Sequence, residues 1–203
     1  MKQPKTSQDI VERSSPTARS ARSPFAIIWM FGAIVLCLLV LADFSFGVLS
    51  SVRAYVGGES RWSKAQKDAV FHLQKYAVTR APDDLLQFRE NVGVALGDHA
   101  ARLEMNKAHP DIQKVRQGFI RGGNNVDDVD GMFDLYHRFA WVHFMQRAIR
   151  AWEAADHYIL QLDEAGSSLQ REIESPSPRL PEIQSTLAEV SLINENLTPI
   201  ENQ

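Results

Sequence analysis

Six histidines have the broadest chemical range of any residues in this sequence, because imidazole binds metal ions and titrates near neutral pH. His137 and His143 lie six positions apart in a segment of helical periodicity. About 600° of rotation therefore separates them, and they point to different faces of the helix. No His-Glu-x-x-His or paired Glu-x-x-His pattern is present, and the only cysteine is Cys37. We predict no metal site and no cofactor.

A nucleophilic active site is not indicated by the sequence either. Such a site needs a serine or cysteine, a base and an orienting carboxylate that converge in space. The Gly-x-Ser-x-Gly turn that exposes a nucleophilic serine does not occur, and Cys37 lies within an apolar run. We predict no catalytic residue and expect that this chain is not an enzyme.

Two groups of polar and aromatic residues could bind a small ligand. Arginine presents a forked set of donors that suits carboxylate and phosphate groups, and a few polar groups beside aromatic ones are typical of ligand sites. The alternative is that the charged side chains form solvated helix faces or surface ion pairs, with the tryptophan in a core. The predicted ligand-binding residues are Arg61, Trp62, Lys64, Arg116, Arg121, Asn124 and Asn125.

The sequence Gly122-Gly123-Asn124-Asn125 has two interpretations. Consecutive backbone amides at a double glycine can form a concave nest that receives an anion. The same residues also suit the end of a helix followed by a left-handed turn, which would make them a tight connection between two helices. We favour the connection, because a double glycine alone is weak evidence for an anion site.

An apolar run near the N-terminus indicates a membrane anchor. Phe25 to Ala42 are 18 residues without a charge, which at about 1.5 Å per residue nearly covers a hydrocarbon core of about 30 Å. Apolar residues resume after Asp43, so we predict a transmembrane helix over residues 25–49. The alternative is a cleaved signal peptide with small residues at Val40-Leu41-Ala42, but the run is longer than the roughly 7–15 residues of such signals.

The distribution of charge predicts orientation and excludes one class of partner. Residues 5–24 hold four Lys or Arg residues and residues 43–62 hold two, so the N-terminus should stay in the cytoplasm. We expect residues 1–24 to be a disordered cytoplasmic tail and residues 50–203 to lie in the periplasm beyond the inner membrane. The tail carries a charge of +3, which leaves −6 on the remainder of the chain. A negative exterior argues against nucleic acid as a partner.

Helical periodicity recurs along the rest of the chain, and no segment alternates apolar and polar residues as a strand would. We predict an all-α fold in which four long helices with short connections form an antiparallel bundle like a four-helix bundle. Gly57-Gly58 should bend the first helix, and Asp83-Asp84 should cap the second. The predicted helices cover about residues 51–79, 83–107, 111–120, 126–174 and 180–197.

Two stretches resemble a known class of protein, namely residues 51–70, SVRAYVGGESRWSKAQKDAV, and residues 116–132, RQGFIRGGNNVDDVDGM. With the preceding apolar run they are similar to the extracytoplasmic helical input region of bacterial two-span signalling proteins, whose outputs are diguanylate cyclase, phosphodiesterase or histidine kinase domains. The resemblance implies a sensor that passes a helix displacement to an intracellular enzyme. This sequence departs from the pattern because it lacks a second span and an output domain, so we expect a truncated part of a longer receptor.

Two functions of different classes fit these observations. The first is a sensory module that receives an unknown small-molecule or protein cue outside the cytoplasm. The second is a membrane-anchored periplasmic scaffold that docks a partner and transmits nothing. An extracytoplasmic enzyme would require a convergent site that the sequence does not indicate. The heptad spacing of the final helix, with polar Asn194, is compatible with a homodimer, although Asn194 could instead face solvent at the edge of a monomer.

Overall fold

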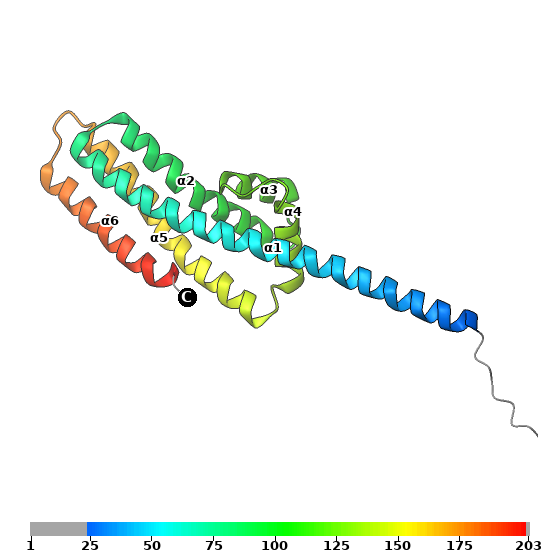
Figure 1. Ribbon diagram of the computed structural model, residues 1–203. Coiled ribbons are helices and arrows are strands. Elements are labelled where there is room, and N and C mark those ends of the chain that lie inside the picture. The colour runs from blue at the N-terminus through cyan, green and yellow to red at the C-terminus, as the bar shows by residue number, and fades with distance from the viewer. Residues whose placement is uncertain (1–23, 202–203) are drawn as a thin grey trace, which may run out of the picture. The chain divides into compact units, whose positions relative to one another are not determined.

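The computed structural model describes residues 24–201, which form six α-helices and contain no strand (Figure 1). The predicted all-α class is confirmed for these residues. The expected disordered tail, residues 1–24, lies outside the described residues except for its last position. The helices are α1 (Pro24–Thr79), α2 (Pro82–Met105), α3 (Ile112–Arg121), α4 (Val129–Phe139), α5 (His143–Ile173) and α6 (Leu180–Glu201).

The chain divides into two compact units, one that ends at Asp43 and one that comprises residues 44–203. In the first unit, α1 exposes large apolar side chains such as Trp29 and Leu38, at 77% and 60% exposure. Among the described residues, α1 is the one helix with a segment long and apolar enough to span a membrane. A signal sequence near the N-terminus satisfies the same test, so retention of residues 25–49 as an anchor stays a prediction.

The second unit contains a main core to which four helices contribute. Leu73, Phe88, Leu162 and Val190, from α1, α2, α5 and α6 respectively, are fully buried in it. Figure 1 shows these four helices running alongside one another. A smaller core connects α3 and α4 to α1 and α2, and its buried residues are Ala54, Ala101, Met105, Val115, Phe119, Val129, Met132 and Tyr136.

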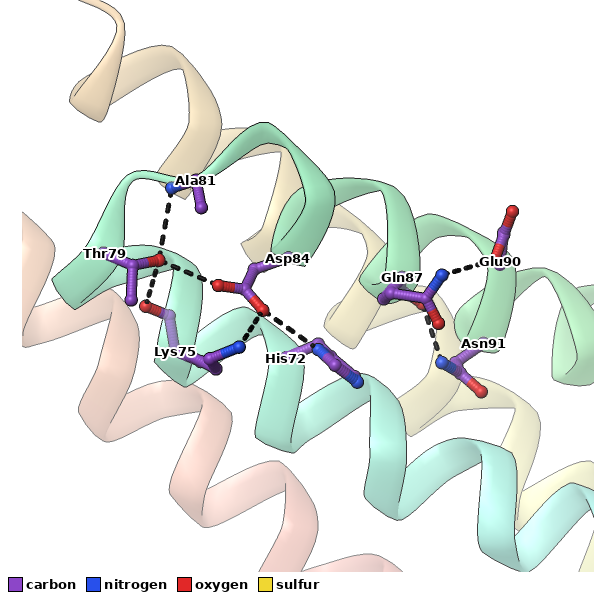
Figure 2. A network of polar contacts seen from close by, with 8 residues as sticks. All are labelled: His72, Lys75, Thr79, Ala81, Asp84, Gln87, Glu90 and Asn91. Carbon is purple, nitrogen blue, oxygen red and sulfur yellow. Dashed lines mark hydrogen bonds and ion pairs between the residues drawn. The ribbon is translucent and has the colours of Figure 1, made fainter.

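The turn between α1 and α2 is stabilised by the buried carboxylate of Asp84 (Figure 2). Asp84 accepts hydrogen bonds from Lys75 Nζ at 2.8 Å and from Thr79 Oγ1 at 2.8 Å, and His72 Nδ1 lies 3.2 Å away. The hydrogen bond from Lys75 is the main reason why the pKa of Asp84 is lowered. The predicted cap at Asp83-Asp84 is wrong, because the N-cap is Ala81 without a side-chain cap. Asp84 binds side chains of α1 instead of the orphan amides of α2.

Helices α2 and α3 cross at very short backbone distance. A Cβ atom built on Gly97 would lie 2.6 Å from the backbone N of Gly122 and 2.8 Å from the carbonyl O of Gly118. A Cβ atom on Gly118 would lie 2.7 Å from the backbone N of Ala101. Only glycine fits at these two positions, and the crossing fixes the connection at residues 122–128 against α2.

The segment predicted as one helix over residues 126–174 is two helices. α4 ends at Phe139, and α5 begins at His143 after an extended N-cap residue, Val142. The residues at the break, Phe139 to Phe144, are mostly aromatic or β-branched, and such residues are weaker helix formers than Leu, Glu or Lys. The break allows α4 to pack in the smaller core, while α5 packs Ile149 and Trp152 against that core and its residues from Ala155 to Ile173 in the main core.

Side-chain contacts within the second unit describe the surroundings of Gly58 and Asn194. α1 continues as a helix through Gly57 and Gly58 without a break. A Cβ atom on Gly58 would lie 2.8 Å from Oδ1 of the buried Asn124, so a larger residue there would displace this amide. Asn194 of α6 does not simply face solvent, because its Oδ1 accepts a hydrogen bond of 3.0 Å from Nε2 of the buried Gln66.

Candidate functional site

A cavity of about 650 Å³ lies within the second unit and is lined by residues of all six helices and of the α3–α4 connection. Its volume is within the range of small-molecule sites. Small side chains explain the space, because Gly58 of α1 and Ala148, Ala151 and Ala155 of α5 all line it. The cavity therefore exists where small residues on the lining helices leave volume that larger side chains would fill.

Aromatic side chains form one wall of this cavity. The rings of Tyr55 and Trp152 are stacked with centroids 5.6 Å apart, and Phe119 meets Tyr55 edge-on at 6.3 Å. The hydroxyl of Tyr55 donates to the carbonyl O of Met132 at 2.9 Å. Desolvation raises the pKa of Tyr55, so the phenol stays neutral and the wall adds no charge to the site.

Asp98 is the central acid of the cavity. Its Oδ1 accepts a hydrogen bond of 2.9 Å from Asn124 Nδ2, and Asn124 Oδ1 in turn accepts one of 3.0 Å from Arg61 Nη2. Burial outweighs these contacts and raises the pKa of Asp98 to about 8. The carboxyl is consequently protonated at neutral pH. The three side chains connect α1, α2 and the α3–α4 connection through one polar chain of contacts.

The stability of the full chain should depend on pH through Asp98. A folded pKa of about 8 against an ordinary value of 3.8 means that the folded state binds this proton more tightly. The contribution of Asp98 to the free energy of unfolding is therefore fully present below about pH 4. It declines as the pH rises and is lost above about pH 8. We expect the melting temperature in non-ionic detergent to fall between about pH 6.5 and 8.5 and the Asp98→Asn variant to lose most of that fall, because asparagine is isosteric and does not ionise.

Asp127→Asn is the matched control for this prediction, because Asp127 is exposed and does not line the cavity. Its melting temperature should follow that of the parent chain at every pH. Equal pH dependence of the Asp98→Asn variant and the parent would show that Asp98 does not carry this titration.

A second polar cluster pairs α2 with α5. Arg102 Nη1 lies 3.3 Å from Glu153 Oε1, and Arg102 Nη2 pairs with Asp156, whose Oδ2 is also 3.0 Å from His99 Nδ1. Burial, and then the charge of Arg102, lower the pKa of His99, so the imidazole is neutral at pH 7. Arg102 is only 7% exposed, and its buried Nε has no hydrogen-bond partner among the described residues.

The structure brings together three of the seven residues that the sequence proposed for ligand binding. Trp62 and Asn124 line the cavity, and Arg61 contacts Asn124. The other four do not line it. Arg116 of α3 pairs with Asp130 of α4 at 2.5 Å, Asn125 Oδ1 accepts from the amide of Asp127 at 3.2 Å, and Lys64 and Arg121 are exposed.

The hydrogen bonds of the α3–α4 connection distinguish between an anion nest and a tight helix connection at Gly122-Gly123. The amides of Gly122, Gly123 and Asn124 donate to the carbonyls of Gly118, Ile120 and Phe119, each at 2.9 Å. Gly123 has a φ of +76°, the left-handed conformation expected of a helix end. The connection is therefore confirmed. These three amides are already engaged and are not free to form an anion nest.

Several cavity residues escaped the sequence analysis. Asp98, His99 and the buried Arg102 all line the cavity, and none of them is among the predicted ligand-binding residues. The available signal was the run of small residues at Ala148, Ala151 and Ala155, spaced three and four apart on α5. A stripe of alanines on a core-facing side predicts either close helix packing or free volume.

Neither a metal centre nor a catalytic constellation is evident in the part of the chain that the structure describes. Within residues 24–201, no group of three His, Cys, Asp or Glu side chains is arranged to hold a metal ion. The cavity contains carboxyl, imidazole and guanidinium groups, and most of these are paired with one another across α2 and α5. Such an arrangement is suited to binding a polar ligand.

Comparisons with known protein families, curated proteins and solved structures found no match to this chain. The resemblance of residues 51–70 and 116–132 to bacterial sensor input regions therefore stays a hypothesis. Functional inference for this chain rests on the geometry of the cavity and on the apolar segment of α1.

Proposed function

We propose that this chain is the sensory input module of a bacterial transmembrane receptor and that its cue binds in the cavity. The observation that carries the proposal is that α1 contains both an apolar, membrane-length segment and the cavity residues Tyr55, Glu59 and Trp62. A ligand that prefers one position of α1 would shift or rotate the helix that enters the lipid. The output enzyme lies outside this chain, and the chain itself performs no reaction.

We infer that α1, α2, α5 and α6 act as an antiparallel four-helix bundle, with α3 and α4 inserted between the second and third long helices. Support comes from the shared main core and from the short connections at residues 80–81 and 174–179, which reverse the chain. In the proposed receptor a second span would follow α6.

The proposed partners follow from the charge of the chain. The charge of −6 beyond the N-terminal tail favours a small-molecule or protein cue over nucleic acid. A homodimer of such modules is part of the proposal. Asn194 is hydrogen-bonded through its Oδ1 to Gln66 within the chain, so the proposed homodimer does not rest on this residue.

The predicted topology can be tested by fusing alkaline phosphatase, which is active only outside the cytoplasm, after Gln203 of the full chain. We expect high phosphatase activity with the N-terminus in the cytoplasm, because basic residues are concentrated before Phe25. A β-galactosidase fusion at the same position, active only in the cytoplasm, should be inactive. The reverse pattern would place residues 50–203 in the cytoplasm and overturn the proposed location.

The signalling role can be tested in the gene itself by reading the coding DNA past codon 203. A frame that continues into a second apolar span and a cyclase, phosphodiesterase or kinase domain supports the sensory module. An immediate stop codon without an adjacent output gene would contradict it. The alternative would then be a membrane-anchored periplasmic scaffold without signalling output.

A further inference from the structure

We propose that the cavity binds an organic monoanion with an aromatic body, and that Arg147 and Arg150 of α5 hold its charged end. This inference rests on the proposed function, to which it adds the chemical class of the cue.

The three arginines that line the cavity differ in whether an acidic side chain is paired with them. Arg102 is neutralised by Glu153 and Asp156. Arg147 and Arg150 also line the cavity, but neither forms an ion pair with any residue in the range 24–201. Residues three apart on a helix are neighbours on one face, so one carboxylate can accept from both guanidinium groups.

The acids of the cavity favour a ligand with a single negative charge. Asp98 is hydrogen-bonded to Asn124, and Asp156 is paired with Arg102. Glu59 of α1 is exposed and is the one lining carboxylate without a partner in the described part of the chain. A ligand with a second anionic group would be repelled by Glu59, whereas a monoanion bound at α5 would not need to approach it.

The remainder of the lining is suited to an aromatic or other apolar body. Trp62 of α1 and Trp152 of α5 both line the cavity and are half-buried, so each keeps surface that a ligand could cover. Ala148 and Ala151 leave the space beside Arg147 and Arg150 without side-chain bulk. An aromatic ring there gains from burial of apolar area and from contact with the indoles.

Arg102 provides a further donor. Its Nε is buried and unpartnered among residues 24–201, although the two terminal nitrogens of the same guanidinium are paired. A buried donor without an acceptor costs about 1–3 kcal/mol, and a small shift of the Arg102 side chain toward the cavity would let a ligand acceptor relieve that cost. A carboxylate oxygen is such an acceptor, whereas a cationic ligand would place a further positive charge against this group.

The test is isothermal titration calorimetry on the full chain in lipid nanodiscs, with empty nanodiscs as the blank. The probes are 3-phenylpropanoate and its neutral amide, 3-phenylpropanamide, which have the same body and differ in charge. We expect the acid to bind at least about tenfold more tightly than the amide, because hydrogen bonds to charged groups contribute about 1.5–3 kcal/mol. The Arg147→Gln/Arg150→Gln variant should lose about 10–100-fold in affinity for the acid and little for the amide.

Two control variants separate the site from general effects. Arg171→Gln removes an exposed charge from the far end of the same helix, which does not line the cavity, and should leave binding unchanged. Ala151→Leu should fill the cavity and weaken binding of both probes. Equal affinity for acid and amide, insensitivity to the double arginine variant, or no binding of either probe would overturn the proposal.

Failure of this test is distinguishable from failure of the proposed function. A chain that binds neither probe, but whose gene continues into a second span and an output domain, remains a sensor for a ligand of another class. A chain that binds 3-phenylpropanoate through Arg147 and Arg150, but whose frame closes without an output, is an anion-binding protein without the proposed signalling role.

Discussion

Replacing Phe88 with alanine is expected to destabilise the folded chain by about 3–5 kcal/mol, the largest loss that we predict for one side chain. Phe88 is fully buried in the main core. Its ring fills the space over Gly166 of α5, where a Cβ atom would lie only 2.2 Å from Cε1 and Cζ of the ring. The ring holds α2 and α5 apart. Its removal should therefore leave a cavity.

The measurement is unfolding of the full chain by denaturant in non-ionic detergent, followed by circular dichroism. Phe71→Ala is the matched control. Phe71 of α1 is 58% exposed, so its truncation should change the free energy of unfolding little. The contact with Gly166 predicts a coupling. Gly166→Ala should destabilise the parent chain, yet be neutral or stabilising in the Phe88→Ala background. If Gly166→Ala lowers the free energy of unfolding equally in both backgrounds, the Phe88 ring does not pack closely against α5.

Helix ends were predictable wherever the sequence marks them chemically. Pro82 begins α2, the double glycine at 122–123 ends α3, and Ser175 to Pro178 separate α5 from α6. Proline lacks an amide donor and glycine accepts left-handed conformations, so these residues act on the backbone irrespective of tertiary contacts. The break at 140–142 contains neither residue. Most of its residues are weak helix formers, and it separates α4, which packs in the smaller core, from the residues Ala155 to Ile173 of α5 that pack in the main core.

The site was less predictable than the helices. A helical stripe shows which face points inward, but it does not show whether a facing helix fills the space that the stripe encloses. Asp98 and Arg102 flank the apolar stripe of α2, and only the small side chains of α5 determine that they meet a cavity. Asn124 was identified correctly as a polar residue near a turn, whereas its burial depends on the crossing of α2 and α3.

The same crossing links local backbone geometry to the cavity. Gly122 is buried beside Asp98, to whose Oδ1 a Cβ atom would be only 2.0 Å. Phe119 and Asn124, on either side of the double glycine, both line the cavity. A displacement of α3 from α2 would therefore move one aromatic ring and one polar side chain of the site together. The cavity and the α2–α3 contact are best regarded as one structural element.

Substitution of Gly97 by alanine tests that element and should destabilise the chain by about 1–3 kcal/mol, as overpacking does elsewhere. The added methyl group would meet backbone atoms of Gly118 and Gly122 at 2.8 Å and 2.6 Å, and backbone cannot move aside as a flexible side chain can. Gly57→Ala is the control, since a Cβ atom on Gly57 would have only ordinary contact with Arg61 Nη1 at 3.6 Å. Alanine at position 57 should stabilise α1 by about 0.5–1 kcal/mol through helix propensity. Opposite signs for the two variants are the expected result, and a stabilising Gly97→Ala would mean that α2 and α3 are further apart than described.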